Sequence, residues 1–365
     1  MTPIDDVYAR LPDPDLPARQ AVDCIAFGQA DAFFHLAATK EDRISKLKAF
    51  FAGKRVRKLY LCAHLSGFDC QVEGLEVGYL EASFFQETDP VRRLENQQLV
   101  HGCVVIFNSS VIRSMLPNSA FVELYEACSS TCFVAWDHDN HHWLQMSTFM
   151  AAHSDIYVPA HHENLYILSR YNWLTAGPVY ASSLQWSRKF LTENLPKMLT
   201  AQRSPDPLGK HVQYIRFGFR NSVVRTLETH YPSIGFSQQT FHARTPQDRL
   251  EEWYSHKMHW IAPVLNDITI RIFDALVTGG IPIVPASLRL LPPVSAIPRE
   301  HIAFCTPMDI VNPHTLVARI NQRFDEMACD GMVARHRFAL EHHHANTSIE
   351  HMLRIAAEVL EFERN

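Results

Sequence analysis

The chain has 365 residues, which is more than one hydrophobic core usually organises, so two domains are expected. Its 47% apolar and 20% charged residues are those of an ordinary globular protein, which excludes a disordered or fibrous chain. The formal charge of −5 lacks the basic surplus of nucleic-acid-binding proteins, so nucleic acid is not an expected partner.

The sequence shows no pattern for membrane insertion or export. No run of 18 consecutive apolar residues occurs, and the amino terminus lacks the charged-then-apolar pattern of a signal peptide. The eight cysteines include no Cys-x-x-Cys pair, and most lie beside apolar residues, as in "LYLCAHL". We therefore expect reduced core cysteines in a cytoplasmic protein.

Short apolar runs rich in Val, Ile, Tyr and Phe predict strands in the first half of the chain. A helical pattern at 119–130, which Ser119 can cap, lies between two of these runs. Apolar strands that alternate with helices indicate a parallel sheet with both faces covered. The predicted strands are residues 22–28, 57–65, 103–109, 132–139 and 155–161.

The alternation stops between residues 171 and 210, where the stretch 195–211 holds three prolines, and then resumes. In the second half, Thr245 and Asp248 fit the capping box of a helix. Two α/β units in succession predict two Rossmann-like domains with parallel sheets that face a central cleft. The later strands are predicted at 211–219, 233–236, 258–264, 281–285 and 302–306, and the helices at 220–231, 245–257, 266–278 and 341–362.

Two basic residues lie where the strand predicted at 211–219 gives way to a helix. Arg220 and Arg225 are five positions apart in "RFGFRNSVVR". Two guanidinium groups at such a turn could clamp a diphosphate, because each can bind phosphate oxygens in a bidentate way. Two surface arginines at a helix start are the alternative. Lys257, just before a strand, is likewise either a donor contact or a helix-end lysine.

The stretch "NDITIRIFDALVTGGIPIVP" combines a polar helix start with a Gly-Gly stop and a buried strand. Asn266 and Thr269 can cap the helix, which leaves its first N–H groups available to an anion. Arg271 and Asp274 are three residues apart and share a helix face, so Arg271 could add charge and Asp274 could accept ribose hydroxyls. A surface Arg–Asp pair is the alternative.

The part "RIFDALVTGGIPIVP" resembles the carboxyl-domain signature of GT-B glycosyltransferases, in particular bacterial members of the glycosyl transferases family 1 type. The resemblance covers roughly residues 211–310. Asp274 stands where the family has the acidic residue that binds the ribose of the donor, and Asn266 stands where many relatives carry a further acid. Arg220 and Arg225 resemble a pair of basic residues of that family.

This resemblance implies a GT-B architecture and a nucleotide-sugar donor that is held by the second domain. It implies domains at residues 1–185 and 186–345, with 346–365 as a helix that crosses back to the first domain. It also implies a sugar transferase that needs no metal or other cofactor. The acceptor would be a glycan or glycoconjugate of the bacterial cell surface, and a peripheral association with the membrane stays open.

The stretch "FVAWDHDNHHWLQMS" ends a predicted strand of the first domain with a polar cluster. Transfer with inversion needs a base for the proton of the acceptor hydroxyl, and Asp or His can serve. We expect Asp139 or His138 to be that base and Asp137 to be structural or to orient it.

The same cluster supports two other hypotheses. Asp and His at this density can bind a divalent metal, with His161–Glu163 adding ligands, so a metal-dependent hydrolase built on Asp137–His142 is one alternative. Polar residues that merely line a cleft would leave a non-catalytic protein that binds sugar nucleotides. The third histidine group, His342–His344, is predicted to be a solvated helix face.

Overall fold

The structure is a computed structural model that describes residues 30–63, 65, 70–112, 119–138, 144–169, 171–180, 182–214, 217–237, 244–265 and 267–364. The strand predicted at 22–28 and the candidate residues Asp139 and Asn266 lie outside the described residues. The chain forms two compact units. The first runs to Tyr180 and resumes at Ser348, and the second is Ala181–Thr347, so the chain passes between the units twice.

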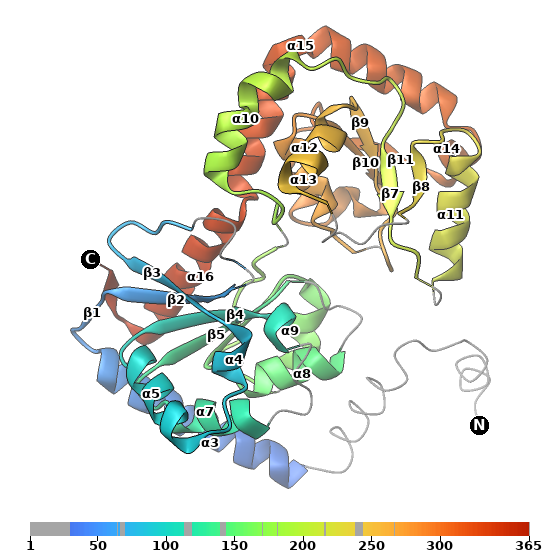
Figure 1. Cartoon of the computed structure of the whole chain (residues 1–365). Coiled ribbons are helices and arrows are strands. Elements are labelled where there is room, and N and C mark those ends of the chain that lie inside the picture. Colours follow the sequence, from blue (N-terminus) through green and yellow to red (C-terminus); the bar gives the residue numbers. More distant parts are fainter. Residues whose placement is uncertain are drawn as a thin grey trace, which may run out of the picture. The chain divides into compact units, whose positions relative to one another are not determined.

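The first unit is built on a five-stranded, wholly parallel sheet with the order β3-β2-β4-β5-β6 (Figure 1). Every residue of the last three strands is buried, which is why their sequences read as continuous apolar runs. The four strands predicted within the described part of this unit are confirmed, whereas β3, whose burial is partial, was not predicted. The strands are β2 (Lys58–Cys62), β3 (Glu76–Leu80), β4 (Val104–Asn108), β5 (Cys132–Asp137) and β6 (Ile156–Pro159).

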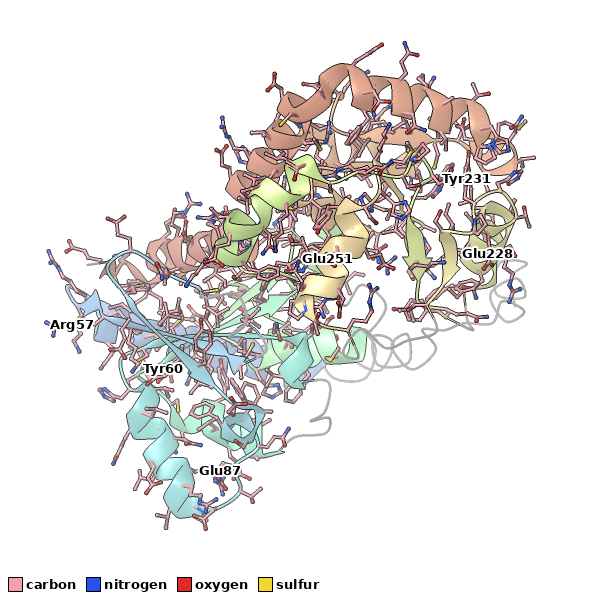
Figure 2. The ribbon with its side chains drawn as sticks, turned by 45° about the horizontal axis from the view of Figure 1, so that its top comes forward. Arg57, Tyr60, Glu87, Glu228, Tyr231 and Glu251 are labelled. Carbon is pink, nitrogen blue, oxygen red and sulfur yellow. The ribbon has the colours of Figure 1, made fainter. Side chains whose placement is uncertain are left out.

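Helices cover this sheet, and α3, α5 and α7 lie together on one side of it in Figure 1. Tyr60, labelled in Figure 2, lies in the buried strand β2. The end of the chain returns to this unit, because β12 (Glu363–Arg364) pairs in parallel with β1 (Arg55–Val56). The helices are α3 (Ala30–Phe51), α4 (Ala82–Phe85), α5 (Pro90–Val100), α6 (Ser109–Ile112), α7 (Ser119–Ala127), α8 (Leu144–Ala152), α9 (His162–Leu168) and α16 (Ala345–Leu360).

A buried ion pair ties α3 to the start of β6. The Arg43 guanidinium meets both carboxylate oxygens of Asp155, with Nε 2.5 Å from Oδ1 and Nη2 3.2 Å from Oδ2. The same carboxylate accepts from the Tyr125 hydroxyl at 3.1 Å and from the Phe133 amide at 2.7 Å. A buried carboxylate with four donors is fully satisfied, so this network fixes the helix against the sheet.

Replacing Asp155 with asparagine is therefore expected to lower the free energy of unfolding by about 3–5 kcal/mol, because it leaves Arg43 buried without its counter-charge. Denaturant unfolding measures the loss. Asp42→Asn is the matched control, since Asp42 pairs with Lys46 on the exposed face of the same helix and should cost less than about 1 kcal/mol. Equal losses for the two variants would contradict this account of the network.

The second unit also holds parallel strands. One sheet has the order β11-β10-β9, and β7 pairs with β8. An isolated parallel bridge between Leu208 and His259 joins the two sheets through β9. The strand predicted at 211–219 is wrong: the strand ends at His211, and a helix already begins at Gly218. The strands are β7 (Gly209–His211), β8 (Ile234–Phe236), β9 (Met258–Trp260), β10 (Ile281–Pro285) and β11 (Ala303–Cys305).

The helices of this unit confirm some of the sequence patterns and extend them. Thr245 and Asp248 form the predicted capping box. The helix α15, which is interrupted by a kink at Ala328, was not predicted and packs along α10 (Figure 1). The helices are α10 (Arg188–Thr200), α11 (Gly218–Glu228), α12 (Pro246–Tyr254), α13 (Arg271–Val277), α14 (Pro307–Val311) and α15 (His314–His342), with short 3-10 turns at Ala286–Leu290 and Val294–Ala296.

The Gly-Gly pair after α13 has two separate roles. Gly279 has a φ of 77°, the left-handed conformation in which helices commonly end. At Gly280 a β-carbon would come within 2.5 Å of the His259 ring, so only glycine allows β10 to approach that buried side chain. The predicted stop between a helix and a buried strand is thus confirmed.

The prediction of a solvated histidine cluster at His342–His344 is wrong for two of its members. His343 is buried and stacks on Phe273 of α13, with ring centroids 4.4 Å apart. His344 is fully buried, and its Nε2 lies 3.0 Å from the Trp186 carbonyl oxygen. The cause is that α15 ends at His342, so the chain turns inward there instead of continuing an exposed helix.

Two further findings concern the helices and the cysteines. Among the described helices, none combines the length and the apolar character that crossing a membrane requires. Six of the seven described cysteines are buried, as expected for small core residues.

Candidate anion-binding site

Three segments of the second unit meet at one edge of its sheets. β7 ends at His211, the chain leaves β9 after Trp260, and α13 begins at Arg271. The carboxyl ends of parallel strands lie at the same edge, which is where ligands of open α/β sheets bind. The side chains of this edge therefore define the candidate site of this unit.

Arg220 lies in the first turn of α11 and reaches back to the strand ends. Its Nε donates to the Ala262 carbonyl at 2.8 Å, and its Nη1 donates to the Val212 carbonyl at 2.7 Å. Val212 follows β7 and Ala262 follows β9, so one guanidinium joins the two chain segments that leave these strands. The guanidinium carbon also lies 5.4 Å from the centre of the Tyr214 ring, within the range of a cation–π contact.

Arg271 is the first residue of α13 and lies close enough to Arg220 for the two charges to interact. These two arginines, with the His211 ring between the strand end and α13, are called the cationic group. Its Nη1 donates to Nδ1 of His211 at 2.9 Å. A guanidinium has no acceptor, so Nδ1 of His211 must carry the lone pair and the imidazole is neutral. The backbone N–H of Arg271 donates to the Thr269 hydroxyl at 3.2 Å, which places Thr269 beside the site, at the helix start.

Burial and mutual repulsion lower the pKa values of this group, while the carboxylates of Asp274, near Arg271, and Asp267, near Arg220, act in the opposite direction. Burial and then the positive charge of Arg220 lower the pKa of Arg271 to about 10. Burial and then the charges of Arg271 and Arg220 hold the pKa of His211 well below its usual value. In the part of the chain that the structure describes, neither arginine forms an ion pair with a carboxylate. Two guanidinium groups that repel each other at a strand edge would gain from a multivalent anion.

Asp274 lies one turn further along α13 and is fully buried. Its Oδ1 accepts from the Ser183 hydroxyl at 2.8 Å and its Oδ2 accepts from the Gln185 amide at 2.6 Å. Burial raises the pKa of its carboxyl group to about 6, although both hydrogen bonds act in the opposite direction. The predicted ribose contact thus requires that a ligand replace groups of the chain itself.

Arg225 and Lys257 are not brought to this group. Five residues correspond to about 500° around a helix, so Arg225 faces away from Arg220, and it is exposed. Glu228, labelled in Figure 2, marks the far end of the same helix. Lys257 precedes β9 and therefore lies at the amino edge of the sheet, where its Nζ is 2.7 and 2.8 Å from the two carboxylate oxygens of Asp325.

The start of α13 also differs from the prediction. The helix begins at Arg271 and not at Asn266. Asp267 instead closes a turn before it, because its side chain accepts from the Val264 amide at 3.0 Å. Leu265 within this turn has a φ of 48°, so the backbone leaves the helical path there. The helix is therefore shorter, and Asn266 lies outside the described residues.

In the first unit, the described part of the Asp/His cluster follows β5. Asp137 is fully buried, and its Oδ2 accepts hydrogen bonds from the Tyr157 hydroxyl and, at 3.3 Å, from the Asn164 amide. These two donors fix the carboxylate between β6 and α9. His138 is 7% exposed and packs on the Trp136 ring with centroids 5.1 Å apart. The other proposed base, Asp139, lies outside the described residues.

Several residues of the site were missed by sequence reasoning. His211 looked like an ordinary strand residue, and Tyr214 was assigned to the same strand. Ser183 and Gln185 were placed in a connector without function. None belongs to a local motif, because His211 and Arg271 are 60 residues apart and Ser183 and Asp274 are 91 apart.

Among the described residues, no group of three or more His, Cys, Asp or Glu side chains is arranged to hold a metal ion. Residues 139–143, which include most of the Asp/His cluster, are outside that set.

Comparison with known proteins assigns no family. No family model matches the chain, and no curated protein does. Among solved structures, tagatose-6-phosphate ketose/aldose isomerase from Escherichia coli matches with 11% sequence identity and a TM-score of 0.21, over 93% of each chain. A likeness at that score carries no argument about fold or activity. The parallel sheets themselves establish a mixed α/β, Rossmann-like fold.

Proposed function

We propose that the protein is a glycosyltransferase of the GT-B type, whose second unit binds the diphosphate of a nucleotide-sugar donor. The observation that carries the proposal is the pair Arg220 and Arg271. Both guanidinium groups lie at the strand edge where ligands of such sheets bind, and neither has a carboxylate partner among the described residues. The signature "RIFDALVTGGIPIVP", which resembles that family, supplies Arg271 itself.

The chemistry of sugar transfer fits such a site. The bond between the anomeric carbon and the diphosphate oxygen breaks, and a bond to the acceptor oxygen forms. The leaving diphosphate gains negative charge as this happens, so fixed cations that face it lower the barrier. The acceptor hydroxyl loses a proton, which His138 or Asp139 would take, with Asp137 as the orienting carboxylate.

Apolar side chains near the cations favour a nucleotide over a bare phosphate. Tyr214 is 40% exposed and contacts the Arg220 guanidinium through its ring. Leu265, in the turn that follows β9, is 58% exposed. A base needs a flat apolar surface beside the phosphate contacts, and the Tyr214 ring, which contacts Arg220, offers one. The expected acceptor, a bacterial surface glycan or glycoconjugate, rests on the family resemblance alone.

Turnover is the direct test of the proposed activity. Purified protein is incubated with UDP-, GDP-, dTDP- and CMP-sugars and with bacterial glycan extracts, and release of the free nucleotide is measured. We expect one donor to be consumed, and only when acceptor is present. A donor that binds and is never consumed would favour a non-catalytic nucleotide-binding protein. A tightly bound metal in protein that ignores every nucleotide would favour the hydrolase.

A further inference from the structure

Two side chains of the segment Ser183–Gln185 donate hydrogen bonds to Asp274, the carboxylate that is expected to bind ribose. Ser183 and Gln185 donate to different oxygens of Asp274, at 2.8 and 2.6 Å. Ser183 is fully buried, and so is Asp274. Ser182, the neighbouring serine, is also buried, yet its hydroxyl has no hydrogen-bond partner. The two contacts to Asp274 are therefore specific to positions 183 and 185.

The pattern of donors is informative. One O–H and one N–H approach the two oxygens of a single carboxylate. The 2′ and 3′ hydroxyls of a ribose would offer two donors to the same two oxygens. We propose that the segment Ser183–Gln185 is an internal substitute for the ribose diol, and that a ribonucleotide displaces it from Asp274. This inference rests on the proposed function, since it takes the donor to be a nucleotide.

The displaced segment is bonded to the other connection between the units. The Ser183 amide donates to the His343 carbonyl at 2.7 Å, and the Ala345 amide donates to the Ser183 carbonyl at 3.2 Å. His344 also lies 3.0 Å from the carbonyl of Trp186. The segments Ser183–Gln185 and His343–Ala345 are thus hydrogen-bonded to each other at Ser183. Displacement of Ser183 from Asp274 is expected to disturb these two backbone hydrogen bonds.

Two variants and a matched control test the substitution. The double variant Ser183→Ala, Gln185→Leu removes both donors, and Ser182→Ala removes a buried hydroxyl that does not contact Asp274. Because the ligand no longer competes with the chain, the double variant should bind the nucleoside diphosphate about tenfold or more tightly than the unaltered protein. Ser182→Ala should match the unaltered protein. The probes are UDP, GDP and ADP, followed by the 2′,3′-dideoxy form of the one that binds.

The outcomes separate this inference from the proposed function. Binding of none of the probes to the unaltered protein overturns this inference, and the proposed function falls with it only if no donor is consumed in the turnover assay. Binding to the unaltered protein with no gain in the double variant overturns the substitution alone. The dideoxy probe should gain nothing from the double substitution, because it has no hydroxyl for Asp274. An equal gain for both probes would contradict the ribose assignment.

Hydrogen exchange on the unaltered protein gives a second test that no folding defect can obscure. A saturating ribonucleotide should speed exchange of the Ser183 and Ala345 amides, although ligands usually slow exchange. Trp186 provides a parallel signal, because its indole donates to the Pro246 carbonyl at 2.9 Å and its fluorescence should change on displacement. Slower or unchanged exchange at both amides would overturn the inference.

Discussion

Replacing Arg271 with glutamine is expected to weaken nucleoside diphosphate binding by about 10- to 100-fold. The substitution removes one guanidinium of the pair, and a charge-assisted hydrogen bond contributes about 1.5–3 kcal/mol. The stability of the unliganded protein should not fall. Burial and the charge of Arg220 already disfavour the charged form of Arg271, as its lowered pKa shows. A variant that binds poorly and unfolds at the same temperature or higher is the expected result.

Arg225→Gln is the matched control for that experiment. Arg225 lies on the same helix as Arg220, but it is exposed and faces away from the strand edge. Its loss should change affinity by less than about twofold, as for an isolated surface charge. Equal effects of the two substitutions would show that binding follows net charge and not the Arg220–Arg271 pair. Isothermal titration gives both dissociation constants.

The second large effect is a loss of stability in acid. Burial, with the nearby His342 as a lesser cause, lowers the pKa of His343 to about 3, and burial lowers the pKa of His344 to about 4. The unfolded chain takes up a proton at each position near pH 6.5, while the folded chain stays neutral. Stability is therefore full above about pH 6.5 and is lost as the pH falls, by about 2 kcal/mol for each histidine at pH 5.

Asp274 acts in the opposite direction in the same unit. Its pKa is raised to about 6, so protonation of its carboxyl group between pH 6 and 4 favours the folded state. This offsets about 1 kcal/mol at pH 5, which is less than the loss from His343 and His344, and the buried His211 and His259, whose pKa values are also lowered, add to that loss. Denaturant unfolding at pH 7, 6 and 5 measures it.

Substitutions at neighbouring positions check the assignment of the acid effect. His343→Phe keeps an aromatic ring against Phe273 and removes the titrating group, so it should reduce the loss between pH 7 and 5 by about 2 kcal/mol. His342→Ala, at the exposed neighbour, removes only the lesser cause of the lowered pKa of His343 and should change the loss between pH 7 and 5 far less. A pH dependence that is the same in all three proteins would contradict the assignment to the buried histidines.

Local patterns in the sequence were sufficient for the elements that are determined locally. The buried strands β4, β5 and β6 are continuous apolar runs, and the Thr245–Asp248 box begins α12 as predicted. The helix α15 was missed, although Leu316, Val317, Ile320 and Phe324 follow helical spacing and are buried. The end of β7 at His211 and the inward turn after His342 depend on tertiary packing, which no local pattern reports.

The residues of the candidate site also differ in whether local sequence patterns could identify them. Arg220 and Arg271 could be proposed from sequence because basic residues near a helix start form a local pattern, although the predicted element boundaries around both were wrong. Their neighbour His211, and the contact of Ser183 with Asp274, depend on pairs that are 60 and 91 residues apart. The position of Lys257 relative to Arg220 and Arg271 was not predictable, because it depends on the short strand β9, which separates Lys257 from the carboxyl edge of the sheet.

Titration of the unaltered protein with UDP, GDP, dTDP, ADP and CMP, each compared with its nucleoside, tests the central claim most directly. The account predicts that one nucleotide binds at one site per chain, that its nucleoside binds far more weakly, and that Arg271→Gln removes the difference. Binding of no nucleotide at millimolar concentration, or equal binding of nucleotide and nucleoside, would contradict it.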